Sequence, residues 1–147
     1  MPESTAAAKP VTVRCLFCET LNRVDLTRLA NRPKCAQCGR PIRLDVPVKA
    51  TESDFDRTVQ TAAVPVLADF YADWCAPCRM MAPTVDSLAH DRAGEILVLK
   101  VDTDANPQLA QRFGIRGIPT VISFRDGKEH RRHVGAADRE TLDRLLV

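Results

Sequence analysis

Apolar residues in the last two thirds of the chain gather in short runs that predict strands. The densest run, 64–72, contains β-branched and aromatic residues and is too short for a buried helix of usual length. The run 95–101 has the same character, and both runs predict buried strands. Residues 120–124 and 128–134 flank Asp126-Gly127, which is typical of a two-residue hairpin turn, and they predict two further strands.

Segments with helical features separate and follow these strands. Ser53 is a candidate N-cap with two acidic residues in the next turn, and Asn106 with Pro107 marks another helix start. Pro83 lies inside the longest segment and predicts a kink there. The predicted helices are 53–60, 75–91, 106–113 and 138–146. Strands that alternate with helices and end in a hairpin and a helix predict an α/β domain with a mixed central sheet.

The first 50 residues differ in composition from the rest of the chain. They are poor in large apolar residues and carry nine basic and four acidic residues, whereas residues 51–147 carry twelve and fifteen. A segment of this size buries too little surface to fold without a metal ion, disulfides or a host domain. We therefore predict an N-terminal domain with its linker over residues 1–50 and a second domain over residues 51–147.

The composition of the whole chain limits the class of protein. The 147 residues are 45% hydrophobic and 27% charged, which is ordinary for a globular domain. No apolar run approaches the roughly 18 residues of a membrane-spanning helix, so we expect no membrane partner. The first ten residues lack the basic and apolar segments of a secretory signal, which favours a cytoplasmic protein.

Six cysteines form three Cys-x-x-Cys pairs, and the first two pairs predict a zinc site. Cys15 and Cys18 are followed, after sixteen residues, by Cys35 and Cys38, a spacing typical of four-cysteine zinc ligation. Four thiolates fill a tetrahedral shell, so one zinc ion here has a structural role and supplies folding energy that the segment lacks. Two disulfides and two further redox pairs are the alternatives, and a reducing compartment disfavours structural disulfides.

The third pair lies where a predicted strand meets a predicted helix. The positive end of the helix dipole stabilises a thiolate at Cys75, and Pro77 suits the first helical turn. Cys78 falls on the same helical face, within reach of a disulfide. This arrangement predicts thiol–disulfide exchange in which Cys75 attacks and Cys78 resolves the mixed disulfide. An inert disulfide and half of a metal site remain open.

Asp69 is a carboxylate inside an apolar strand, where an unpaired charge is unfavourable. A buried acid of this kind finds a partner or has a raised pKa and moves protons. Lys100 is the other charge in a comparably apolar strand, so we expect a contact between the two side chains. The alternative is that Asp69 lies at a strand end and reaches water.

Several of these motifs together resemble one known family. Residues 67–83, LADFYADWCAPCRMMAP, closely resemble the active-site segment of thioredoxins. The match continues, in the same order and spacing, through 100–102, 106–107, 113–120 and Gly135. The resemblance covers about residues 53–147 and implies a thioredoxin fold and a protein-disulfide reductase. A second type of bacterial thioredoxin, with a zinc-binding N-terminal extension, resembles the chain over its full length.

The resemblance also implies roles for individual residues. It makes Asp69 the buried acid that assists proton transfer to and from Cys78, with Lys100 nearby. Pro119 becomes a cis-proline that faces the disulfide, and the backbone of Ile118 before it pairs with an extended substrate segment.

Other residues near the third pair have less defined roles. Trp74 precedes Cys75, and Pro77 lies between the two cysteines. Two roles are open for Trp74: contact with substrate, or packing beside the loop. Ala76 replaces the usual glycine between the cysteines, which leaves the reduction potential open. The two methionines after Cys78, Met80 and Met81, are interpreted as packing residues.

The favoured hypothesis is a monomeric thiol–disulfide oxidoreductase with one structural zinc ion and no cofactor for the dithiol. Its expected partners are disulfide-containing substrate proteins and, as the resemblance implies, an NADPH-dependent thioredoxin reductase. We expect no nucleic-acid partner, because the basic residues of the N-terminal segment are scattered. A redox-responsive zinc-containing chaperone or adaptor and a disulfide oxidase or isomerase are the competing hypotheses.

Overall fold

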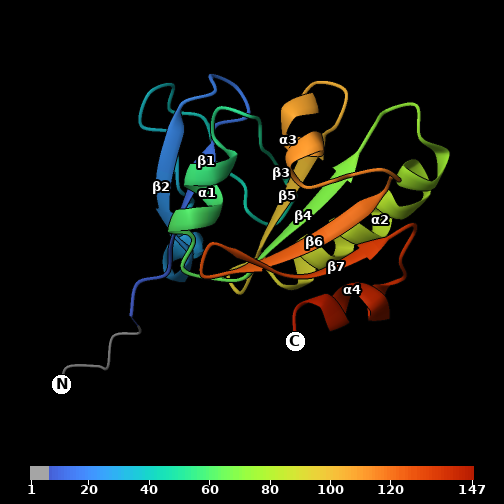
Figure 1. The fold of residues 1–147 in the computed structure, drawn as a ribbon. Coiled ribbons are helices and arrows are strands. Elements are labelled where there is room, and N and C mark those ends of the chain that lie inside the picture. The colour runs from blue at the N-terminus through green and yellow to red at the C-terminus, as the bar shows by residue number, and fades with distance from the viewer. Residues whose placement is uncertain (1–6) are drawn as a thin grey trace.

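A computed structural model describes residues 7–147 and contains two sheets (Figure 1). The strands are β1 (Pro10–Arg14), β2 (Leu21–Asp25), β3 (Val48–Lys49), β4 (Val66–Tyr71), β5 (Leu97–Asp102), β6 (Thr120–Arg125) and β7 (Lys128–Val134). The helices are the 3-10 helix η1 (Leu26–Asn31) and the α-helices α1 (Phe55–Thr61), α2 (Ala76–Asp91), α3 (Pro107–Arg112) and α4 (Arg139–Leu145). Within this described range no helix is long and apolar enough to cross a membrane.

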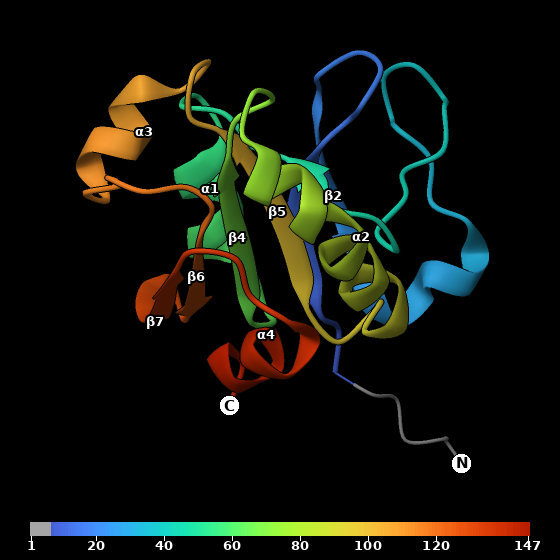
Figure 2. The same cartoon turned by 90° about the vertical axis from the view of Figure 1, so that its right-hand side faces the viewer.

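The central sheet has the strand order β3-β5-β4-β6-β7. Strands β3, β5 and β4 are parallel, whereas β6 and β7 are each antiparallel to their neighbours, so the mixed sheet is confirmed. Helices α1 and α3 cover one face, and α2 and α4 cover the other (Figure 2). Strand β4 ends at Tyr71 and α2 begins at Ala76, so a short loop joins the carboxyl end of β4 to the start of α2.

The strands and helices predicted for residues 51–147 are all present, with no end shifted by more than two residues. Helix α1 begins at Phe55 with Asp54 at its N-cap, so the N-cap prediction at Ser53 was one residue early. The Asp54 carboxylate accepts a hydrogen bond from the backbone of Thr51 at 2.7 Å, which fixes the turn before the helix. Helix α2 continues through Pro83 as one element.

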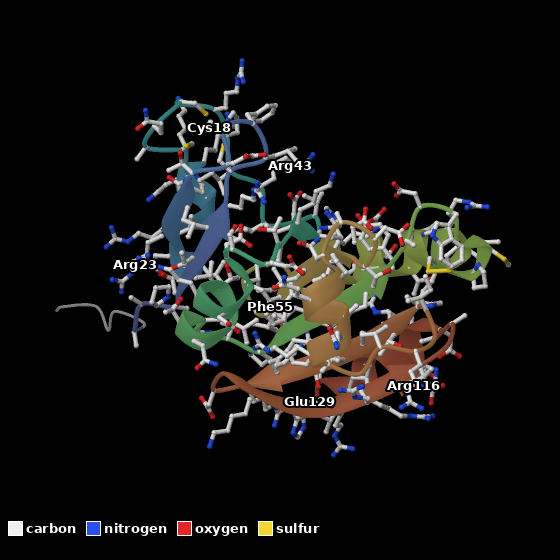
Figure 3. All side chains as sticks on the ribbon, turned by 45° about the horizontal axis from the view of Figure 1, so that its top comes forward. Cys18, Arg23, Arg43, Phe55, Arg116 and Glu129 are labelled. Carbon is white, nitrogen blue, oxygen red and sulfur yellow. A yellow bond between two sulfur atoms is a disulfide. The ribbon has the colours of Figure 1, made fainter. Side chains whose placement is uncertain are left out.

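The N-terminal hairpin of β1 and β2 packs against α1 on one side of the central sheet. Val11 and Val13 of β1 are fully buried and share one apolar cluster with Phe55 and Val59 of α1. Figure 3 shows Phe55 between the hairpin and the central sheet. A continuous core therefore joins the hairpin to the rest of the molecule.

The segment that links the hairpin to α1 also takes part in the central sheet. Val48 and Lys49 form β3 and pair with β5, although they precede the division predicted near residue 50. That division remains a prediction. Residues 1–6 of the predicted N-terminal domain lie outside the described residues. They make up most of the ten-residue segment in which no secretory signal was predicted.

Candidate active site and metal centre

The third cysteine pair lies at the start of α2, directly after β4. Cys75 is the N-cap residue of α2, and its sulfur accepts a hydrogen bond from the backbone N–H of Cys78 at 3.2 Å. The two cysteines form a disulfide with their Cα atoms 5.2 Å apart, and both side chains are buried. The two sulfurs therefore meet without a change in the helix, which suits a disulfide that opens and closes.

A loop from the other side of the sheet covers this disulfide. The Ile118–Pro119 peptide bond is cis, as the resemblance implies, and it immediately precedes β6. The carbonyl oxygen of Ile118 lies 3.7 Å from the sulfur of Cys75. The side chain of Ile118 packs against the small cluster formed by Ala72 and the two cysteines. The predicted substrate-facing loop and the disulfide therefore lie side by side.

Asp69 is buried in the middle of β4, the strand that leads to this site. Its side chain is 2% exposed, and among the described residues its Oδ1 atom has no hydrogen-bond partner. Burial raises the pKa of Asp69 to about 6; the negative charge of Asp86 adds to this and the positive charge of Lys100 opposes it. The alternative that Asp69 reaches water at a strand end is wrong.

Lys100 is the direct neighbour of Asp69 across the β4–β5 pair. Its ammonium nitrogen lies 4.4 Å from the centroid of the Tyr71 ring, a cation–π contact. Within residues 7–147 no ion pair of 4.0 Å or less joins Lys100 to Asp69. The two groups are adjacent as expected, but Lys100 acts on the carboxylate through space rather than by a direct bond.

Exposed apolar side chains lie on both sides of the cysteine pair in the sequence. Trp74 is 67% exposed, and its indole N–H donates a hydrogen bond to the carboxylate of Asp104 at 2.8 Å. Met80 is 81% exposed, so its interpretation as a packing residue was wrong, whereas Met81 is buried. The sequence offered no signal for Asp104, because its contact depends on how the turn after β5 meets the loop before α2.

The first two cysteine pairs form two matching knuckles. In each knuckle the first cysteine accepts a backbone hydrogen bond from the residue after the second cysteine, Glu19 or Gly39. Both of these residues have positive φ, 68° and 77°. Gly39 fits the predicted turn, and Glu19 adopts the same conformation with a side chain.

The two knuckles bring their four sulfurs together, and this geometry fits one zinc ion. All four sulfur atoms lie within 4.8 Å of one another and none is in a disulfide. The Cys15 and Cys38 sulfurs are 3.7 Å apart, and those of Cys18 and Cys35 are 3.5 Å apart. Tetrahedral zinc with Zn–S distances of about 2.3 Å requires sulfur separations close to these.

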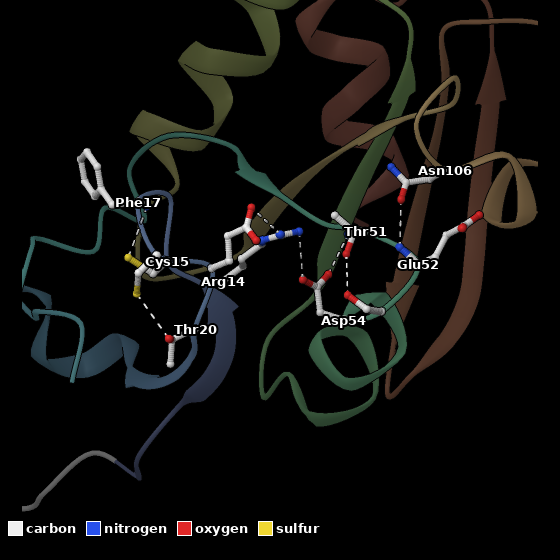
Figure 4. Close-up of polar contacts among 11 residues, drawn as sticks. Arg14, Cys15, Phe17, Thr20, Thr51, Glu52, Asp54 and Asn106 are labelled. Carbon is white, nitrogen blue, oxygen red and sulfur yellow. Dashed lines mark hydrogen bonds and ion pairs between the residues drawn. The ribbon is translucent and has the colours of Figure 1, made fainter. Parts of the chain in front are cut away.

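Hydrogen bonds around the sulfurs of Cys15 and Cys35 lower their pKa and favour thiolates, the form that binds a metal ion, whereas, despite a backbone hydrogen bond, burial and hydrogen bonds with the other cysteines raise the pKa of Cys38 to about 11. The backbone N–H of Phe17 donates to Cys15, and the side-chain amide of Asn22 donates to Cys35, each at 3.4 Å (Figure 4 shows the contact at Phe17). The backbone N–H of Cys38, together with Asn22 and a second backbone N–H, lowers the pKa of Cys35 to about 6. These four cysteines are therefore suited to hold one zinc ion. The bound ion would link the two knuckles and would have no open coordination position.

Comparison with known proteins agrees with both sites. A family model described as Thioredoxin matches residues 46–147, and a zinc-ribbon model described as "Thioredoxin 2, N-terminal" matches residues 14–40. The chain belongs to the thioredoxin family. It is a protein-disulfide oxidoreductase that carries an N-terminal zinc ribbon.

Individual relatives match about two thirds of the chain. "Thioredoxin 1" of Nostoc sp. is 48% identical over 98 residues, covering 67% of this chain and 92% of the relative. "Thioredoxin" of Mycobacterium bovis is 42% identical over 99 residues, covering 67% and 85%. The solved structure of a mutant thioredoxin from Halobacterium salinarum NRC-1 is 38% identical, with a TM-score of 0.65, and the match covers 71% of this chain and 91% of that one.

Proposed function

We propose that Cys75 is the nucleophile and Cys78 the resolving cysteine of protein-disulfide reduction. The position of Cys75 at the N-terminus of α2, beside the Ile118–Pro119 loop, is the observation that carries this assignment. The backbone N–H groups at the helix start favour a thiolate on Cys75 in the dithiol form. Among residues 7–147, the sulfur of Cys75 accepts a hydrogen bond from the helix backbone and the sulfur of Cys78, one turn further on, accepts none, so Cys78 is assigned as the second thiol.

In the reaction, two electrons pass from the dithiol to the substrate disulfide. The Cys75 thiolate attacks one substrate sulfur, a mixed disulfide forms, and the other substrate sulfur leaves as a thiolate that takes up a proton. Cys78 then loses its proton and attacks the sulfur of Cys75. The Cys75–Cys78 disulfide closes and the second substrate sulfur leaves as a thiol.

Asp69 is proposed to accept the proton of Cys78 during this second step. Its burial and its unpartnered oxygen leave it free to take a proton, and a pKa of about 6 lets it carry one near neutral pH. Lys100 is proposed to keep the carboxylate in its charged form before the transfer, because its positive charge lies on the adjacent strand.

The substrate is proposed to bind across the exposed side chains next to the disulfide. Trp74 and Pro77 are exposed at the start of α2, and Met80 adds a further apolar surface. The backbone of Ile118, held by the cis bond to Pro119, is proposed to pair with an extended substrate segment.

Disulfide-containing proteins are the substrates of the family. We propose in addition that a thioredoxin reductase restores the dithiol, and that the chain acts as a monomer in the cytoplasm.

Insulin reduction tests the assignment of the two cysteines and Asp69. The wild-type chain, supplied with dithiothreitol, is expected to reduce insulin, and Cys75→Ser is expected to lose all catalysed reduction. Asp69→Asn is expected to keep reduction but to lower its rate most above pH 6, where the wild-type acid is ionised. Reduction that is unaffected by Cys75→Ser would contradict the proposal and favour an adaptor or chaperone, and the measured reduction potential separates a reductase from an oxidase.

A further inference from the structure

A groove of about 670 Å³ lies between the first zinc knuckle and the edge of the central sheet. Its walls are largely apolar and include Leu16, Phe17, Ile42, Val46 and Val48. This volume falls within the range of pockets that hold a ligand or several side chains. Neither the dithiol nor the predicted zinc ligation uses the groove, apart from Cys15 at its margin.

Two lysines lie next to each other in the lining of this groove. Lys49 of β3 and Lys100 of β5 are direct partners in the parallel pair, so their side chains leave the same face of the sheet. Like charges in register destabilise a sheet. In the described part of the chain no carboxylate oxygen comes within 4.0 Å of either ammonium group. A bound anionic group would remove this repulsion.

The other charges of the groove are already paired. Arg14 lies 2.9 Å from Glu19, the one acidic residue of the lining, and Arg43 lies 3.1 Å from Asp45. The charge left to meet a ligand is therefore that of the two lysines. Positive charge beside apolar walls is complementary to a segment that combines a carboxylate with an apolar side chain.

The rim of the groove exposes apolar surface at the tip of the knuckle. Leu16 is 73% exposed and Phe17 is 52% exposed, and the Arg40 guanidinium lies 4.9 Å from the centroid of the Phe17 ring. Exposed apolar residues that gather beside a groove mark a binding surface more often than single scattered ones. Two lysines, Arg40 and one exposed ring are too few for a nucleic-acid strand, which needs a row of cations and stacked aromatic residues.

The groove and the dithiol lie at the same end of the molecule. In both Figure 1 and Figure 2 the two loops of the ribbon and the loop that enters α2 project toward one end. Lys100, in the groove, contacts the ring of Tyr71, and Tyr71 packs against the cluster that contains Cys75 and Cys78. A protein whose disulfide is at Cys75 could therefore place a second segment in the groove.

We propose that this groove is a second docking site for the substrate protein that reacts at Cys75. It takes an extended acidic segment, with an apolar side chain against Leu16 and Phe17 and a carboxylate between Lys49 and Lys100. This inference rests on the proposed function, because the occupant is part of the same substrate.

The test compares two synthetic disulfide-bridged peptides with the zinc-loaded full chain. The peptides share one reactive disulfide and differ in a tail that alternates leucine with either glutamate or lysine. We expect the glutamate-tailed peptide to have a KM lower by about fivefold, the size of effect expected for a partly exposed charged contact, with similar kcat. Lys49→Glu and Leu16→Ser are expected to reduce this difference, whereas Lys128→Glu on the opposite edge strand leaves it unchanged.

The outcomes separate the docking site from the reaction itself. Equal KM values for the two peptides, or a difference that Lys49→Glu and Leu16→Ser preserve, would overturn the docking site while leaving the reductase assignment intact. Failure of the wild-type chain to reduce either peptide would overturn the proposed function. A single-stranded oligonucleotide that competes as well as the free glutamate tail would assign the groove to nucleic acid and overturn the proposal.

Discussion

The guanidinium group of Arg14 lies 3.6 Å from the carboxylate of Asp54 and links the zinc ribbon to the start of α1 (Figure 4). Arg14 immediately precedes the zinc-ligand candidate Cys15, and its side chain is 19% exposed against 7% for Asp54. The pair lies next to the apolar cluster shared by β1 and α1. The ribbon and the thioredoxin fold are therefore expected to unfold together.

Arg14→Ala tests this link. The change leaves the Asp54 carboxylate buried with its one bond from Thr51, so we expect a loss of about 1–3 kcal/mol in the free energy of unfolding. Arg23→Ala, at an exposed position of β2, is the matched control and is expected to change it by less than about 0.5 kcal/mol. Denaturant titrations measure both, and equal effects of the two substitutions would argue against the link.

Zinc removal is expected to destabilise the whole chain rather than the ribbon alone. Val11 and Val13 share a buried cluster with Phe55, so we expect loss of the metal ion to loosen the hairpin and expose this part of the core. Chelation of zinc, or Cys35→Ser, should lower the denaturant concentration at the midpoint of unfolding, as measured by the fluorescence of Trp74. Trp74 lies far from the ribbon in sequence. A Trp74 transition that is the same with and without zinc would show that the two parts unfold independently.

Asp69 predicts a pH-dependent stability of the oxidised protein. Its pKa is about 6 in the folded state against 3.8 for the free group, so the folded state binds more protons between these values. The stability it contributes is fully present below pH 3.8 and is lost as the pH rises through 6, at a cost of about 3 kcal/mol by pH 7. Asp69→Asn should therefore be more stable than the wild type at pH 7 and not at pH 4.

The control for this experiment is Asp126→Asn, at the exposed β6–β7 turn. It removes an exposed carboxylate by the same chemical change, so it separates the effect of the buried position of Asp69 from the effect of losing a carboxylate. Urea titrations at pH 4 and pH 7 compare the three proteins. An Asp69→Asn effect of equal size at both pH values would show that folding does not raise the pKa of Asp69.

Trp74 should report the redox state of the neighbouring cysteines. The indole is fixed by its bond to Asp104, beside the loop that carries Cys75, so opening the disulfide changes the surroundings of the ring. We expect different emission spectra for the dithiol and disulfide forms, and Asp104→Ala should alter the spectrum of both. Identical wild-type spectra in the two forms would count against this placement of Trp74.

Local chemistry made much of the structure predictable. The alternation of apolar runs with capped helices identified the strands and helices after residue 50, and the spacing of the cysteines identified both knuckles. Contacts between distant segments were not predictable from these signals. The bond from Trp74 to Asp104, the pairing of Lys49 with Lys100 and the burial of β1 against α1 depend on how the loops and layers meet in space.

The departures at single residues have the same origin. Met80 and Met81 have similar side chains, and only the direction of α2 against the sheet decides that one is exposed and the other buried. The expected contact of Asp69 with Lys100 is correct in register, yet the lysine turns to the ring of Tyr71, which the sequence did not indicate.

Trapping of the mixed disulfide tests the central claim most directly. Cys78→Ser removes the resolving thiol, so the reduced variant, mixed with a disulfide-containing substrate, should accumulate a covalent adduct linked through Cys75. Mass spectrometry of the digested adduct identifies the linked cysteine. An adduct on Cys75 that is absent from Cys75→Ser is the predicted result; no adduct, or one on a ribbon cysteine such as the exposed Cys38, would contradict the account.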